Sequence, residues 1–291
     1  MANLKQIRLR IRTAKNIQQI TRAMKLVAAA RLKKATDRVM EARSYSEKLR
    51  ELMLNLSSAG ELPQHPLMDK RPVQKVLFIL LTADRGLAGS YNTNLIRRAG
   101  EFIQAQTVPV SMVGVGKKGT GFYGKRGVQI IETIPVQGTG ARLEDAQHIK
   151  DLAQGMYERG EVDAVFIEYS KFYSPIRQIP QIVQLLPIEP PTSEAGEQGA
   201  IAGERTNFAF EPNPAELLNT LLPRYFLTLI WQALLEATAS EHGARMSAMT
   251  SATDNAGKMI QNLTLKANRE RQSTITTQIL EVVSGAEALR A

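Results

Sequence analysis

One stretch without proline or glycine opens the chain, from Asn3 to Ala59: NLKQIRLRIRTAKNIQQITRAMKLVAAARLKKATDRVMEARSYSEKLRELMLNLSSA. Its apolar residues recur at spacings near three and four: Leu4, Ile7, Ile11, Ala14, Ile17, Ile20, Met24, Val27, Ala35, Val39, Ala42, Tyr45, Leu49, Leu52 and Leu56. This spacing is typical of a coiled-coil seam. At ~1.5 Å of rise per residue, such a helix is on the order of 80 Å long. A helix of that length needs a partner along its side.

A second helical stretch closes the chain, over residues 213–287. Its start is marked by Asn213 as a side-chain cap and by Pro214 in the first turn. Residues 233–257 are rich in Ala, Ser, Thr and Gly, and small side chains let another helix approach closely. We therefore expect residues 1–60 and 213–287 to pair as an antiparallel coiled coil.

The segment between the two helices has a different period. Short apolar runs alternate with helical segments over residues 73–190, which indicates a mostly parallel sheet covered on both faces. We expect strands at Val73–Thr82, Val108–Val115, Val128–Glu132, Val162–Tyr169 and Ile182–Ile188, and helices at Asn92–Gln106 and Ala141–Tyr157. The predicted fold class is α+β or α/β: a long antiparallel coiled coil with an inserted Rossmann-like domain of about five strands, and a linker and foot segment at residues 191–212.

Composition narrows the functional classes. The net charge is +9, yet residues 1–50 hold 14 Lys or Arg against three Asp or Glu. This basic helix predicts a counter-charged partner, either nucleic acid, anionic lipid or an acidic protein surface, unless it is simply a solvated outer face. The longest strongly apolar run, Val76–Leu81, is too short to span a membrane, so we expect no direct membrane insertion. The absence of cysteine excludes disulfides and thiol chemistry.

A glycine motif is the sharpest enzymatic signal. Gly114, Gly116 and Gly119 form G-x-G-x-x-G after a predicted strand, with Glu132 placed like a ribose-binding acid. However, residues 119–127 hold four glycines and leave too few residues for a long crossover helix. We therefore favour a glycine-rich loop between strands, and we expect no cofactor.

No catalytic or metal constellation is expected from the remaining polar residues. His65, His148 and His242 lack metal-ligand spacing and are each predicted to be surface residues. Asp84, in the turn DRGLAGS, could act in a cleft, but we favour a role as the cap of the helix that follows it.

Five segments resemble the gamma subunit of F-type ATP synthases, in the same order along the chain. They are Ile11–Leu32 (IRTAKNIQQITRAMKLVAAARL), Thr82–Asn92 (TADRGLAGSYN), Lys171–Pro187 (KFYSPIRQIPQIVQLLP), Ser240–Asn255 (SEHGARMSAMTSATDN) and Ile275–Ala286 (ITTQILEVVSGA). The resemblance covers nearly the whole chain and implies the fold already predicted. It further implies a non-catalytic central rotor shaft that couples transmembrane ion flow to ATP synthesis or hydrolysis on surrounding subunits.

The resemblance also implies partners and contact residues. The partners would be the alpha and beta subunits of the catalytic hexamer, the epsilon subunit and the membrane c-subunit ring, on the cytoplasmic face of a bacterial plasma membrane. The positions that match coupling or ring contacts are Met24, Lys25, Arg245, Arg271, Gln272 and Gln278. The positions that match the contact with the rotor ring and epsilon are Phe208, Phe210 and Glu211, although both Phe side chains could instead pack the α/β domain.

Two departures from the family pattern limit what is carried over. Gln278 stands where the C-terminal signature usually has Glu, so a charge-dependent contact is not carried over to that position. The chloroplast-type regulatory cysteine pair and its insertion are missing, so thiol control is not expected.

Two hypotheses from other classes remain open at this point. A basic coiled-coil protein that binds nucleic acid would show a strongly salt-dependent affinity for DNA or RNA. A dinucleotide-binding enzyme would use the glycine motif, and a bulky residue at Gly116 would then abolish cofactor binding.

Overall fold

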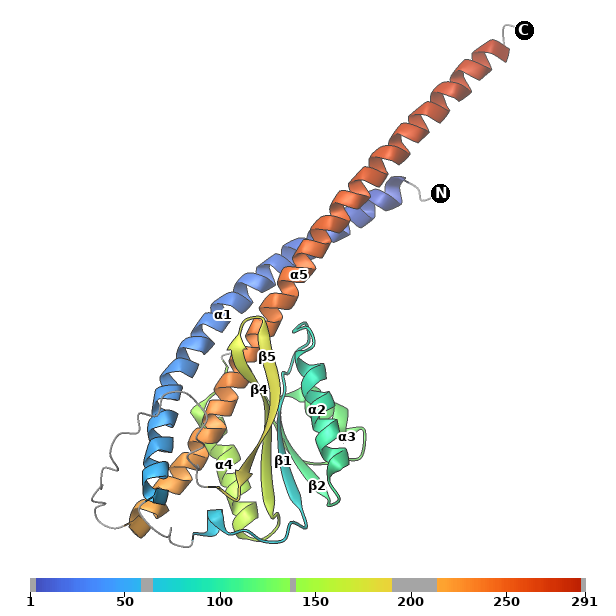
Figure 1. Ribbon diagram of the computed structural model, residues 1–291. Helices are drawn as coiled ribbons and strands as arrows, with labels where there is room; N and C mark the ends of the chain where they lie inside the picture. Colours follow the sequence, from blue (N-terminus) through green and yellow to red (C-terminus); the bar gives the residue numbers. More distant parts are fainter. Residues whose placement is uncertain (1–3, 59–64, 137–139, 190–213, 289–291) are drawn as a thin grey trace. The chain divides into compact units, whose positions relative to one another are not determined.

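Figure 1 presents a computed structural model that describes residues 4–58, 65–136, 140–189 and 214–288. The helices and strands are α1 (Leu4–Ser58), η1 (Pro66–Met68), β1 (Val76–Leu81), α2 (Tyr91–Ala105), β2 (Val110–Val115), α3 (Lys117–Gly124), β3 (Gln129–Ile134), α4 (Leu143–Glu158), β4 (Ala164–Ser174), β5 (Arg177–Leu186) and α5 (Pro214–Ala288). The chain divides into two compact units. One holds residues 1–29 and 245–291, and the other holds residues 30–244, so α1 and α5 each contribute to both.

The larger unit is built around a five-stranded sheet with the order β3-β2-β1-β4-β5. β1 pairs in parallel with β2 and with β4, and β2 pairs in parallel with β3. Only the β4–β5 pair is antiparallel among the strands of this sheet. The predicted mostly parallel sheet of five strands is confirmed.

Both faces of this sheet are covered. Leu77, Ile79 and Leu81 of β1 point to one face, where they pack with α4 and with parts of α1 and α5. The alternate residues Phe78 and Leu80 point to the other face, which α2 and α3 cover. All six residues of β1 are buried, as expected for a central strand of a two-sided parallel sheet.

The region after β2 differs from the prediction. Residues 117–124 form the short helix α3 rather than a loop, and this helix makes the crossover between the parallel strands β2 and β3. Gly114 of β2 and Gly119 of α3 allow close packing at this crossover. A Cβ at Gly119 would lie 2.7 Å from Leu80 Cδ2, and one at Gly114 would lie 1.9 Å from Thr120 Cγ2.

β4 and β5 form a hairpin and extend toward each other beyond the predicted strands. The fourth strand was expected to end at Tyr169 and the fifth to begin at Ile182, whereas the structure extends them to Ser174 and back from Arg177. The intervening residues are mixed polar and apolar, and Pro180 lies among them. Pro180 is accommodated because β5 is an edge strand.

Candidate functional site: the outer surface of the terminal helices

In the unit formed by residues 1–29 and 245–291, α1 and α5 run antiparallel. The Thr253 hydroxyl donates a hydrogen bond to the Thr21 hydroxyl at 2.8 Å. One turn further along, a Cβ at Gly257 would lie 3.0 Å from Gln18 Nε2. The residue numbers of the contacting positions rise along α5 as they fall along α1. This confirms the predicted antiparallel pairing of the terminal helices.

The seam of this pair has a strict seven-residue repeat on α1. Ile7, Ala14, Thr21 and Ala28 are all buried. Small and hydroxyl side chains fill much of the seam, so the two helices approach closely, as the small residues of α5 predicted.

Five residues assigned to the seam from sequence are exposed: Ile17, Ile20 and Val27 in this unit, and Tyr45 and Leu52 in the unit of residues 30–244. Ile17, Ile20 and Val27 are 49%, 60% and 53% exposed. Apolar residues at spacings of three and four fit more than one register, so their spacing alone does not say which of them face α5. The structure instead places Thr21 in the seam, because its hydroxyl has a partner on α5.

Ile17 and Ile20 belong instead to a broad apolar outer surface. Large apolar side chains on both helices of this unit are exposed: Leu9, Ile17, Ile20, Leu26, Val27, Met259, Leu265, Ile275, Ile279, Leu280, Val282 and Val283. Scattered single apolar residues are normal on a surface, but a concentration of this kind on two helices marks a contact surface for a partner. We call these twelve residues the apolar outer surface.

The charge on α1 in this unit has one sign. Residues 4–29 contain seven Lys or Arg and no Asp or Glu. A partner of the apolar outer surface would therefore carry acidic side chains that are attracted to α1. Non-directional apolar contact would then hold the partner on the surface.

The C-terminal end of α5 extends beyond α1. The register set by Thr21 and Thr253 places Leu4 opposite about residue 270 of α5. Residues 271–286 are all exposed, and at ~1.5 Å per residue the unpaired part of the helix is on the order of 25 Å long. A single helix with exposed Ile279, Leu280 and Val283 is a second indication of a partner around it.

The residues predicted to make ring contacts all lie in this unit. Met24 and Lys25 are half-buried on α1, and Arg245 is half-buried on α5. The other three, Arg271, Gln272 and Gln278, are exposed on the extension of α5. Their contacts with a partner stay a prediction. The foot residues Phe208, Phe210 and Glu211 lie outside the described residues.

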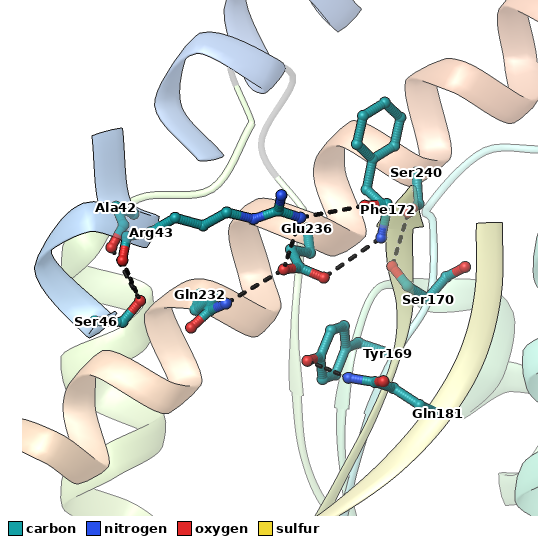
Figure 2. Close-up of polar contacts among 10 residues, drawn as sticks. All are labelled: Ala42, Arg43, Ser46, Tyr169, Ser170, Phe172, Gln181, Gln232, Glu236 and Ser240. Atoms are coloured by element: carbon teal, nitrogen blue, oxygen red, sulfur yellow. Dashed lines mark hydrogen bonds and ion pairs between the residues drawn. The ribbon is translucent and has the colours of Figure 1, made fainter. Parts of the chain in front are cut away.

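In the unit of residues 30–244, a polar cluster joins α1, α5 and the β4–β5 hairpin (Figure 2). Arg43 Nη2 of α1 lies 3.5 Å from Glu236 Oε1 of α5 and donates to the Phe172 carbonyl at 3.3 Å. The Phe172 N–H donates to Glu236 Oε2 at 3.4 Å. The register of β4 and β5 shifts between Phe172 and Ser174, so the backbone of Phe172 can bond to the helices.

Further contacts secure α5 to the same unit. The Ser240 hydroxyl donates to the Ser170 carbonyl at 2.7 Å (Figure 2), and the Tyr91 hydroxyl donates to the Ala237 carbonyl at 3.2 Å. Gln232 Nε2 donates to Glu236 Oε1 at 3.3 Å. Glu236 is fully buried, and these donors satisfy the oxygens of its carboxyl group. We call Arg43, Phe172, Gln232 and Glu236 the Arg43–Glu236 clamp.

The glycine motif has a packing role. Gly116 has a φ of 89°, and a Cβ there would lie 2.0 Å from the Thr82 carbonyl oxygen. The motif thus brings the end of β2 against the end of β1. Glu132, considered as a ribose-binding acid, instead lies 2.9 Å from Nε2 of His148.

Two predictions on single polar residues were wrong. Asp84 Oδ1 accepts from the Lys117 N–H at 2.9 Å, so it caps α3 rather than the next helix, α2; the two helices begin at the same edge of the sheet. His242 is buried, whereas His148 is exposed and His65 is half-buried. His242 was missed because it lies on a helix face that packs inside the fold.

Two other kinds of site, a metal centre and a membrane-spanning helix, are not found in residues 4–58, 65–136, 140–189 and 214–288. Across those ranges, no group of three or more His, Cys, Asp or Glu is placed to hold a metal ion. No helix within them has both the length and the hydropathy needed to cross a bilayer.

Comparison with known proteins points to one family. The family described as ATP synthase matches residues 3–289. An ATP synthase gamma chain of Desulfitobacterium hafniense is 45% identical over 289 residues, which cover 99% of this chain and 100% of that one. The ATP synthase gamma chain of Moorella thermoacetica is 43% identical over 290 residues, with 100% of both chains covered.

A solved structure has a similar fold. A chain in the cryo-EM structure of the Euglena gracilis mitochondrial ATP synthase, determined with OSCP, F1 and the c-ring, aligns with a TM-score of 0.69 at 17% identity. The alignment covers 98% of this chain and 94% of that chain.

Proposed function

Since the chain belongs to the ATP synthase gamma-chain family, we propose that it is the central rotor shaft of an F-type ATP synthase. In this role it couples transmembrane ion flow to ATP synthesis or hydrolysis, while the chemistry takes place on the surrounding subunits. The observation that carries the proposal, beyond family membership, is the apolar outer surface with its basic α1. It is a large contact surface that no other part of the described chain covers.

The physical properties of this surface suit a turning contact. Apolar contact is non-directional, so it can be exchanged as the shaft rotates without breaking a fixed set of hydrogen bonds. Seven basic residues on α1 give long-range attraction to an acidic partner surface. The two together hold the shaft in place and leave its angle free to change.

The proposed contact residues divide by position. Met24 and Lys25 would contact the acidic lever segment of the catalytic subunits. Arg245 would contact loops of the ring, as would the residues of the α5 extension, Arg271, Gln272 and Gln278. Because Gln278 is uncharged at a position usually held by Glu, we expect its contact to be a neutral hydrogen bond.

The Arg43–Glu236 clamp provides the mechanical connection within residues 30–244. A shaft must transmit torque from the sheet to its helices, and the clamp links β4 to both α1 and α5. Glu236 at its centre is fully buried and is contacted by Arg43, Gln232 and the Phe172 N–H, so few alternative geometries satisfy this carboxylate. We expect the sheet and these helix segments to turn as one body.

The remaining partners follow from the complex. We infer contacts with the alpha and beta subunits and with the c-subunit ring, and a contact of Phe208, Phe210 and Glu211 with the ring and epsilon. The location would be peripheral, on the cytoplasmic face of the bacterial plasma membrane.

Nucleic-acid binding stays the alternative use of the basic helix. The close approach of Gly116 to Thr82 argues against a phosphate site there, because the carbonyl oxygen occupies that space.

The test is co-purification with a coupling readout. The tagged chain is isolated from membranes of its source, and the eluate is assayed for ATPase activity and for co-purifying subunits of the hexamer.

In membrane vesicles, substitution of Met24 and Lys25 by Ala should lower ATP-driven ion pumping more than ATP hydrolysis. Lys118→Ala, an exposed change on α3, serves as the control. Recovery of the chain alone or with nucleic acid would contradict the proposal.

A further inference from the structure

An open cleft of about 760 Å³ lies on the larger unit and is lined by none of the residues of the apolar outer surface. Its walls come from α1, from α5 and from the start of α4, all within residues 34–235. The volume falls in the range of roughly 300–1,000 Å³ that small-molecule sites occupy. None of the proposed rotor contacts uses it.

One wall of the cleft is aromatic and aliphatic. Trp231 and Leu227 of α5 are half-buried along it, and Leu235 is buried behind them. Tyr45 of α1 is 56% exposed on the facing side. A flat apolar ligand could cover Trp231 and Tyr45 together and remove both surfaces from water.

The rim of the cleft is basic. Lys34 and Arg38 of α1 and Arg224 of α5 line it, and all three are exposed. Neither Lys34 nor Arg224 makes an ion pair with any residue that the structure describes. Among the described residues, Arg38 makes only a long hydrogen bond of 3.5 Å to the Ala141 carbonyl. These three cations are thus available to an anion.

The net charge of the side chains that line the cleft stays positive when its other charged groups are included. Arg142 is engaged by Asp145, with Nη2 at 2.6 Å from Oδ1. The carboxylates Glu41 and Glu144 also line the cleft. They oppose the binding of highly charged anions, and they favour a ligand with a single negative charge at one end.

We propose that this cleft binds a small aromatic anion. The ring system would lie against Trp231 and Tyr45, and a sulfonate or carboxylate would face Lys34, Arg38 and Arg224. A neutral aromatic compound would gain the apolar contact but not the charge interaction, and an aromatic cation would be repelled. The inference stands apart from the rotor function, since it rests on the cleft alone.

The probe for the test is 8-anilinonaphthalene-1-sulfonate, an aromatic anion whose fluorescence rises in apolar sites. Trp231 is the only tryptophan of the chain, so selective tryptophan excitation reports energy transfer to probe bound near the cleft. The neutral analogue N-phenyl-1-naphthylamine supplies the uncharged comparison. The full-length chain is titrated with each compound, and circular dichroism checks that every variant is folded.

We expect saturable quenching of Trp231 by the sulfonate. The double variant Lys34→Gln, Arg224→Gln should bind it roughly threefold to tenfold more weakly, as for two exposed ion pairs, and should bind the neutral analogue unchanged. Lys33→Gln is the matched control, since Lys33 is exposed on the same helix but does not line the cleft. Probe fluorescence without quenching of Trp231 would overturn the proposal. Equal affinity of the double variant and the parent chain would overturn it as well.

Discussion

Replacement of Glu168 by Gln should make the protein more stable at neutral and alkaline pH. Glu168 lies on β4, beside Leu80 of β1 and Ile182 of β5 in the sheet register. It is fully buried, and neither carboxyl oxygen has a hydrogen-bond partner among the described residues. Burial is the main cause that raises its pKa to about 9; Arg98 opposes the rise and Glu101 adds to it.

The sign and size of the effect follow from proton binding. In the unfolded chain the carboxyl group ionises near its ordinary pKa of 4.5, whereas in the folded protein it stays protonated up to about pH 9. Its contribution to stability is therefore fully present below about pH 4.5 and is lost as the pH rises toward 9. At ~1.36 kcal/mol per pH unit, the loss is roughly 3 kcal/mol at pH 7. Gln has nearly the same shape and does not ionise, so it avoids this loss.

The assay is urea unfolding followed by circular dichroism between about pH 5 and pH 9. The free energy of unfolding of the parent chain should fall with pH more steeply than that of Glu168→Gln, with the curves meeting near the acidic end. Glu281→Gln, at an exposed position of α5, should give a curve parallel to the parent. Parallel curves for Glu168→Gln, or a variant less stable than the parent at pH 8, would refute the reasoning.

Three further substitutions, one of them with a matched control, test other contacts. Arg43→Ala should lower the free energy of unfolding by about 2 kcal/mol, because buried Glu236 loses its cation; urea unfolding that matches the parent would contradict this. Gly116→Ala should lower the free energy of unfolding by more than about 2 kcal/mol, because the added Cβ would meet a backbone carbonyl. Gly121→Ala on α3, with open space around it, is the control and should be neutral or stabilising by up to about 1 kcal/mol. Equal melting temperatures for the two variants would exclude the packing role of Gly116. Thr253→Val should lower stability by about 1 kcal/mol through loss of its bond across the helix pair, and an unchanged melting temperature would show that the bond contributes nothing.

Much of the fold could be predicted because its signals are local. The lack of proline and glycine over Asn3–Ala59 predicts one long helix, and α1 is that helix. The run Val76–Leu81 predicts a buried strand, and β1 is buried throughout. Pro214 marks the first residue of α5. Each of these signals depends on the backbone of its own segment.

The errors came from contacts between distant segments. The seam register depends on which side chain of α1 meets a partner on α5, and Thr21 meets Thr253. Asp84 bonds to the start of α3, 33 residues away, because the ends of β1 and β2 are neighbours in the sheet. For the same reason the apolar outer surface was not predicted, since Ile17 and Ile20 looked like seam residues until the register was known.

The most direct test of the shaft proposal is to observe rotation. The chain has no cysteine, so Lys125→Cys, at an exposed position after α3, provides a single attachment point for a visible probe. The labelled chain is assembled with the alpha and beta subunits of its own complex, the ring is fixed to a surface, and ATP is added. The account predicts stepwise rotation of the probe in one direction that stops when ATP is exhausted. ATP hydrolysis by the assembled complex with a stationary probe would contradict it.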